Sequence, residues 1–186
     1  MPSIIQADQL KSSDGVTTYL NSGTLSNLTF PANTIINQKF HTTTSQPTIT
    51  SNNNFASFST PFKTTITGTK SNSKFLIIVS MTVSSSSTGD AHIYGRLRDN
   101  TNSNATIGTE GSDGLFGDWL ASNAYSGGVR LNHTELYTPS SHSGGDLEIE
   151  VLMKQNGAVT TLLNRRSNDN FYQRFSSTLT ILEIAG

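Results

Sequence analysis

Histidine and paired carboxylates are the side chains of this sequence that could carry acid–base or metal chemistry. His92 stands two residues before Tyr94, and His133 two residues before Glu135, which places each pair on one face of a strand. None of the histidines has partners at the spacing of a metal-binding motif; they are His41, His92, His133 and His142. We therefore interpret all of them as exposed or hydrogen-bonded side chains.

The carboxylates give no stronger indication of a reaction. Glu148 and Glu150 lie on one strand face, which is typical of a solvated outer face and gives no reason for a raised pKa. Asp113 and Asp118 lie among glycines but lack the alternating oxygen ligands of a calcium loop. With no cysteine in the chain, thiol nucleophiles and zinc–thiolate sites are excluded. We predict no catalytic residue, no metal site and no cofactor, which disfavours a sandwich-fold hydrolase.

The composition indicates β structure. Ser, Thr and Asn together make up 69 of the 186 residues, and these residue types favour strands and turns over helix interiors. The formal net charge is -1, and no basic run is present, so neither nucleic acid nor an anionic membrane is expected as the main partner. We see no secretory signal at the N-terminus and no apolar run of membrane-spanning length, and expect a product made in the cytosol.

The longest apolar run, residues 75–83, is predicted to be the central strand. Its first half is apolar at every position, so it needs cover on both faces. Further short strands are expected around it, among them residues 34–44, 55–58, 62–67, 90–98, 105–108, 129–137, 146–154 and 176–185. Asn156-Gly157 is a type I′ turn signal, which predicts a hairpin between residues 146–154 and 158–163.

This pattern predicts an all-β fold, an antiparallel β-sandwich of the jelly-roll kind with an extended N-terminal arm. We place the arm at residues 1–33 and the sandwich at residues 34–186. The arm has too little apolar surface for a core of its own, so contact with another surface is expected to order it. Its docking candidates are the apolar residues Ile4, Ile5, Leu10, Leu28 and Phe30.

The least regular region, residues 110–128, holds the candidate surface-binding residues Trp119, Tyr125 and Phe116. Exposed aromatic side chains can stack on sugars or anchor an interface. The alternative is that the large apolar residues of this loop close the end of the sandwich.

Several stretches resemble small virion structural proteins of marine tailed phages. At the N-terminus these are residues 4–15 and the Leu28-Thr-Phe-Pro-Ala32 segment. In the body they are residues 61–67, 71–79, 96–99, 164–165 and 177–185. The likeness is in strand and turn patterns, and it thins over residues 110–128.

The resemblance implies a fibre or knob protein located in the virion, a homotrimer that docks through its arm onto tail, collar or capsid proteins. The apolar residues on both faces of the C-terminal strand fit subunits that close around a threefold axis, with candidate interface residues Leu179, Ile181, Leu182 and Ile184. Attachment to a host surface glycan is a secondary expectation. The alternative function is a lectin-like carbohydrate-binding module, which the same fold class supports.

Overall fold

The computed structural model describes residues 9–11, 18–21, 24–25, 30–50, 54–85, 91–108, 114–120, 128–156, 160–165 and 175–186. Before Phe30, and at Ala91, Trp119 and Leu120, the description covers the backbone alone. The described residues contain no helix, and so none that is long and apolar enough to cross a membrane.

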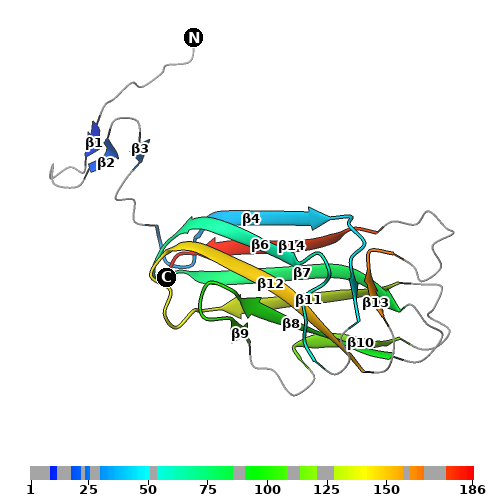
Figure 1. Cartoon of the computed structure of the whole chain (residues 1–186). Coiled ribbons are helices and arrows are strands. Elements are labelled where there is room, and N and C mark those ends of the chain that lie inside the picture. The colour runs from blue at the N-terminus through cyan, green and yellow to red at the C-terminus, as the bar shows by residue number, and fades with distance from the viewer. Residues whose placement is uncertain are drawn as a thin grey trace, which may run out of the picture.

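Two antiparallel sheets pack face to face and form the body of the molecule (Figure 1). We name them the β7 sheet and the β8 sheet after their central strands. The β7 sheet has the order β4 (Ile35–Thr43), β14 (Ser177–Ile184), β7 (Lys74–Ser85) and β11 (Val129–Tyr137). The β8 sheet has the order β6 (Phe62–Thr69), β12 (Gly145–Asn156), β8 (Ala91–Asp99) and β10 (Phe116–Leu120). Three short strands extend them, with β13 (Thr161–Leu163) pairing both β7 and β5 (Thr48–Ile49), and β9 (Ala105–Ile107) pairing β8.

The connections between these strands confirm the predicted jelly roll. In chain order, β4, β7, β11 and β14 belong to the β7 sheet, and β6, β8, β10 and β12 belong to the β8 sheet. Successive long strands therefore alternate between the two sheets. Strands β8 and β10 are the exception, because they lie side by side in one sheet. This order and alternation are those of a double Greek key.

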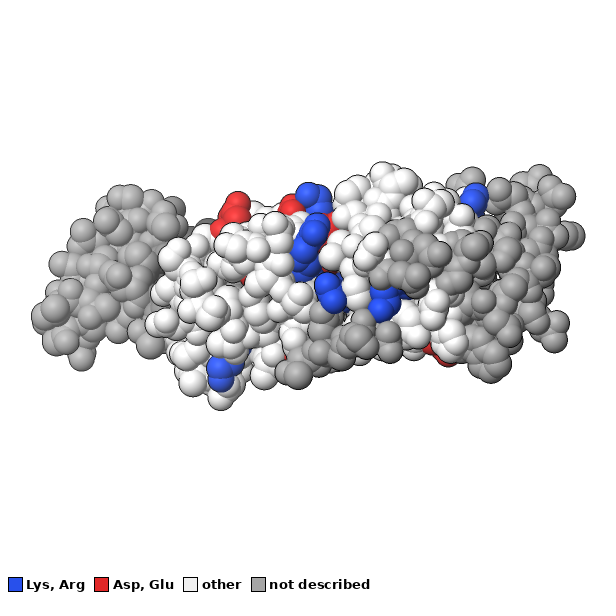
Figure 2. Space-filling model, turned by 60° about the horizontal axis from the view of Figure 1, so that its bottom comes forward, with Lys and Arg blue, Asp and Glu red and all other residues white. Residues whose placement is uncertain are grey.

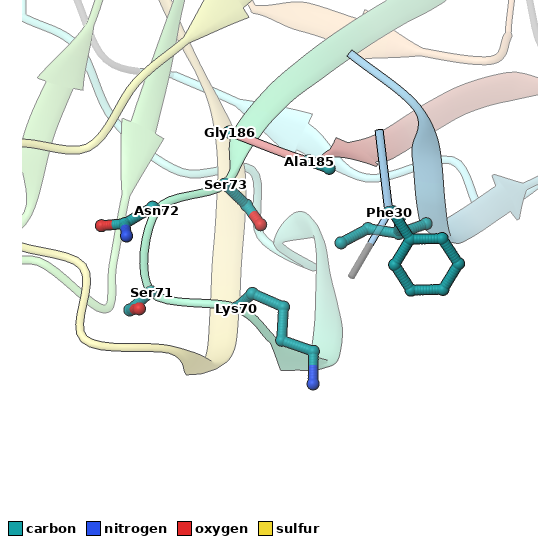
Figure 3. Close-up of a pocket in the computed structure, with 8 residues that line it drawn as sticks. Phe30, Lys70, Ser71, Asn72, Ser73, Ala185 and Gly186 are labelled. Carbon is teal, nitrogen blue, oxygen red and sulfur yellow. The ribbon is translucent and has the colours of Figure 1, made fainter. Parts of the chain in front are cut away.

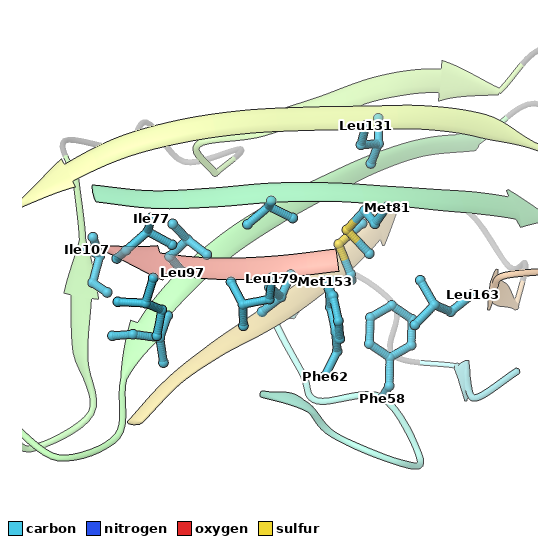
Figure 4. Close-up of a cluster of buried hydrophobic side chains, with 14 of the residues drawn as sticks. Phe58, Phe62, Ile77, Met81, Leu97, Ile107, Leu131, Met153, Leu163 and Leu179 are labelled. Atoms are coloured by element: carbon cyan, nitrogen blue, oxygen red, sulfur yellow. The ribbon is translucent and has the colours of Figure 1, made fainter. Parts of the chain in front are cut away.

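Strand β7 is central, as residues 75–83 predicted, since β14 and β11 flank it on its two sides. Its inward residues Phe75, Ile77, Val79, Met81 and Val83 are almost completely buried. They pack against the inward residues of the β8 sheet, among them Leu97 and Met153, to form one core between the layers (Figure 4).

The predicted hairpin at Asn156-Gly157 is wrong. Strand β13 pairs β7 and β5 in one sheet, whereas β12 belongs to the other. Both edges of β12 are already occupied, by β8 on one side and by β6 and the Ala56 bridge on the other. A turn signal favours a local hairpin only where a strand edge is open, so here the chain crosses between sheets.

Two smaller predictions also change. The expected strand at residues 55–58 is reduced to a single bridge between Ala56 and Met153. The region expected to be irregular, residues 110–128, contains strand β10, which pairs residue by residue with β8.

Asn164 joins three segments of the β7 sheet. It is fully buried, and its backbone lies in the left-handed region with φ 58°, which Asn tolerates. Its Nδ2 donates to the carbonyl oxygens of Thr43 and Ser45, both at 2.9 Å, and its Oδ1 accepts from Ser177 Oγ at 2.6 Å. Its backbone N–H donates to Thr82. One side chain therefore holds the end of β4 and the start of β14 beside β7.

The chain enters and leaves the body at the same end (Figure 1). Asn33 N–H donates to the Ala185 carbonyl, and Ala185 N–H donates to the Thr34 carbonyl. Next to them, the buried Glu183 carboxylate accepts hydrogen bonds from Lys70 N–H and Ser73 Oγ, both at 2.6 Å, and so fixes the turn between β6 and β7. Before this point, β1 (Gln9–Lys11), β2 (Thr18–Asn21) and β3 (Thr24–Leu25) form a separate antiparallel sheet.

Candidate functional site

The histidines occupy four separate environments. His41 packs near the Phe62 ring, and His142 is buried against Thr69 Oγ1 at 2.6 Å. His133 stacks on Phe116 with ring centroids 5.0 Å apart, while its Nε2 lies 3.3 Å from Glu135 Oε2. Within the described residues, no group of three or more His, Asp or Glu side chains is arranged to hold a metal ion.

The outer face of the β8 sheet carries a polar network centred on Glu150. Its Oε2 accepts hydrogen bonds from Arg98 at 2.7 Å and from Asn100 Nδ2 at 2.8 Å, and its Oε1 accepts one from Ser57 Oγ. Glu148, one row away, pairs with Lys63 at 3.0 Å and also accepts from Asn100.

This network corrects the expectation of a solvated carboxylate pair. Glu148 and Glu150 do share one face, but Glu150 is buried, with 3% of its side chain exposed. Burial by itself would raise the pKa of Glu150, but hydrogen bonds from Ser57, Asn100 and Arg98 outweigh it and hold that pKa below its usual range. The pKa of Glu148 is lowered mainly by its hydrogen bond from Asn100, with Lys63 assisting. Both groups act as hydrogen-bond acceptors that join strands and loops.

Because the pKa values of Glu148 and Glu150 are lowered, the free energy of unfolding depends on pH in the acidic range. A carboxylate whose pKa is lower in the folded than in the unfolded state stabilises the folded protein. This contribution is complete at pH values above the unfolded-state pKa, and it is lost as the pH falls through the folded-state pKa. We expect the free energy of unfolding to decrease as the pH falls below about 4.5, the ordinary value for these groups. Glu150→Gln should cost about 2 kcal/mol at pH 7, because Arg98 keeps its charge beside a neutral group, and the difference from wild type should shrink at pH 3.

Urea unfolding of both proteins at several pH values measures this effect. Glu148→Gln is the matched control, since its carboxylate is more exposed and screened, and its effect should be the smaller one. A pH profile that Glu150→Gln leaves parallel to that of wild type would contradict the assignment.

Aromatic and basic side chains occupy the rest of this outer face. The Arg96 guanidinium lies 3.9 Å from the Phe55 ring centroid, and Lys154 Nζ lies 4.9 Å from that of Tyr94. The His92 and Tyr94 rings are nearly parallel, with centroids 6.1 Å apart. Beside Tyr94 an open hollow of about 360 Å³ lies between β8 and β10.

The predicted surface-binding residues are only partly brought to this hollow. Phe116 lines it from β10, half-buried against the core. The Cα of Trp119 is paired with that of His92, and Tyr125 lies outside the described residues. Tyr94 and Phe55 were not among the predicted surface-binding residues, although the alternation of β8 places Tyr94 on the outward face together with His92 and Arg96.

One half of the outer face of the β7 sheet, around Leu76 and Ile78, is largely apolar. Four large hydrophobic side chains are exposed among the described residues, and three of them lie on this face: Ile35, Phe40 and Leu136. Four half-buried apolar residues of β7 and β14 lie between them: Leu76, Ile78, Leu182 and Ile184. We name these seven residues the β7 outer face. Its two middle rows, which run through Leu76 and Ile78, contain no charged residue.

The four predicted interface residues divide between the two faces of β14. Leu179 and Ile181 are fully buried between the sheets, so no partner can reach them in the folded chain. Their assignment to a subunit interface is therefore corrected: they belong to the core of the chain itself. Leu182 and Ile184 lie on the β7 outer face, where an interface remains a prediction.

Among the five predicted docking residues of the arm, Phe30 is the one whose side chain is described. It is partly exposed and lines a hollow of about 290 Å³ with Ile36, Ala185 and the turn from Lys70 to Ser73 (Figure 3). Leu10 lies in β1, where the backbone alone is described, and Ile4, Ile5 and Leu28 lie outside the described residues.

Comparison with family models and with curated proteins gave no match. Among solved structures, the chain is similar to the crystal structure of dimeric latent PorU from Porphyromonas gingivalis, with a TM-score of 0.40 and 11% sequence identity. The similar region covers 83% of this chain and 14% of PorU, so this chain spans far less than the length of that protein.

Proposed function

We propose that this protein is a non-enzymatic structural protein of a tailed-phage virion, which assembles with copies of itself as a fibre or knob. The observation that carries the proposal is the β7 outer face, on which three large exposed hydrophobic side chains adjoin four half-buried ones. Contiguous apolar patches on a folded chain are typical of interaction surfaces. The location in a virion is proposed from the resemblance of the strand and turn motifs to phage virion proteins.

The size of the face suits the centre of such a contact. Four strands at ~4.8 Å spacing and five residues at ~3.4 Å rise cover about 19 by 17 Å, or roughly 320 Å². A specific interface takes about 800 Å² from each partner, so neighbouring polar residues would supply the rest. The neutral middle rows let identical copies approach without like-charge repulsion, and we propose a homotrimer with the arm docking onto tail, collar or capsid proteins.

Light scattering on a sizing column tests self-association. We expect the full chain to elute with the mass of three copies of its 20.0 kDa polypeptide. The double variant Phe40→Lys with Leu136→Lys should elute as a monomer, because buried unpaired ammonium groups oppose association. Thr67→Lys, exposed on β6 in the other sheet, is the matched control and should remain a trimer.

A dimeric wild type that the double variant makes monomeric would keep the interface and overturn the trimer. A monomeric wild type over the whole accessible concentration range would overturn self-association. The alternative, a carbohydrate-binding module, is favoured by a different surface, the Tyr94 hollow.

A further inference from the structure

The Tyr94 hollow lies over the outer face of the β8 sheet beside strand β10. The Tyr94 ring and the exposed His92 lie on this outer face, because both alternate with the buried Ile93. Leu115 and Phe116 also line the hollow, but they pack toward the core, where Phe116 stacks on His133. An aromatic ring with a few polar groups around it is a common element of a small-ligand site.

Gly117 keeps the hollow open on the side of β10. It is paired with Tyr94, so a side chain there would share the face on which the Tyr94 ring lies. A Cβ at Gly117 would lie 2.3 Å from the Ile93 carbonyl oxygen and 3.2 Å from Tyr94 Cδ1. The close approach of the two strands therefore requires glycine, and it leaves the Tyr94 ring without a side-chain neighbour from the opposite residue of β10.

Basic groups border the other side of Tyr94. Lys154, paired with Tyr94 across β12 and β8, holds its ammonium 4.9 Å from the ring centroid, and Arg96 follows on β8. Figure 2 shows Lys and Arg side chains gathered near the middle of one face of the body. A cation beside an aromatic ring keeps its charge and still attracts an anion.

We propose that the Tyr94 hollow binds an acidic glycan. A sugar ring presents apolar C–H groups on its face and hydroxyl groups at its edge, which match the Tyr94 ring and the His92 side chain beside it. A carboxylate or sulfate on the sugar would lie toward Lys154 and Arg96. The inference goes beyond the proposed function, since this site lies on the sheet opposite the β7 outer face.

A nucleic acid strand fits this surface less well. Its bases could stack on Tyr94, but its phosphates would repeat past Glu148 and Glu150, which lie on the same outer face as the four basic residues Lys63, Arg96, Arg98 and Lys154. The acidic groups repel the closely spaced phosphates of a nucleic acid strand. They repel an acidic glycan less, because its charges are widely spaced.

A panel of immobilised uronate-, sialate- and sulfate-bearing glycans tests the proposal with the full chain. Each glycan is paired with its methyl-esterified, desialylated or desulfated counterpart, and a single-stranded DNA oligomer is included. We expect at least one acidic glycan to bind, at least tenfold more tightly than its uncharged counterpart. Tyr94→Ala should lose at least tenfold in affinity, and Lys154→Met should lose the preference for the charged form.

Thr67→Ala, at an exposed position of β6 that belongs to neither proposed surface, is the control and should bind like wild type. Urea unfolding midpoints of all variants separate lost binding from lost folding. The monomeric Phe40→Lys, Leu136→Lys variant should bind each glycan with unchanged intrinsic affinity, so failure of assembly and failure of binding are distinguishable. Binding to no acidic glycan, binding that Tyr94→Ala leaves unchanged, or tighter binding to the DNA oligomer would each overturn the proposal.

Discussion

Asn164→Ala should reduce the free energy of unfolding by at least about 3 kcal/mol. The substitution removes three buried hydrogen bonds and leaves the Thr43 and Ser45 carbonyls and the Ser177 hydroxyl without their partner. Each buried polar group left unsatisfied costs about 1–3 kcal/mol. Alanine must also adopt φ 58°, a conformation that costs it about 1 kcal/mol more than asparagine or glycine.

Two further variants separate these contributions. Asn164→Gly loses the same hydrogen bonds but relieves the backbone, so it should be about 1 kcal/mol more stable than Asn164→Ala. Asn104 has the same φ of 58° in an exposed turn, so Asn104→Ala should show the backbone cost alone. Urea midpoints at constant m-value measure all three. Equal stability of Asn164→Ala and Asn104→Ala would show that the buried hydrogen bonds contribute nothing.

The destabilisation caused by Leu179→Ala should not depend on protein concentration, whereas that caused by Leu182→Ala should increase with it. Leu179 is completely buried beside Val79, and truncating it leaves a cavity that costs about 2–5 kcal/mol at any concentration. Leu182, three residues further on β14, lies on the β7 outer face. Leu182→Ala should lower the free energy of unfolding only slightly in dilute solution. It should lower it more at high protein concentration, because association stabilises the wild type there.

Thermal unfolding at two concentrations at least fiftyfold apart measures this difference. The sizing-column mass provides the second readout, which Leu179→Ala should leave unchanged as long as the chain is folded. A Leu182→Ala effect that is large and independent of concentration would mean that the β7 outer face is covered within a single chain.

Strand patterns were the part of the fold that could be predicted from the sequence. The two-sided apolar run of β7 and the alternation of β8, β12 and β14 reflect burial that each strand experiences on its own faces, and these strands were found. The hairpin after β12 was wrongly predicted because a turn signal is local, whereas the occupation of the edges of β12 depends on β6 and β8, which are distant in sequence.

The candidate site was predictable to a smaller extent. Periodicity separates the residues of β14 into two sets, but which set faces the second sheet depends on packing, so Leu179 and Leu182 could not be distinguished. Alternation places Tyr94 on an outward face. Its neighbours Phe55 and Lys154 come from distant segments, so the aromatic and basic surface became visible only in three dimensions.

The position of β14 between β4 and β7 also determines when the sandwich can close. Strands β4 and β7 do not pair with each other. Each pairs with β14, which follows all the other strands of the body in sequence. Until then, the long apolar β7 has an open edge on the ribosome-bound chain, a template for wrong pairing with other nascent chains. Completion of the fold thus depends on a strand that follows the other strands of the body in sequence, and its rate should depend on long-range strand pairing. Chaperone capacity in the producing cell would then set the yield of native protein.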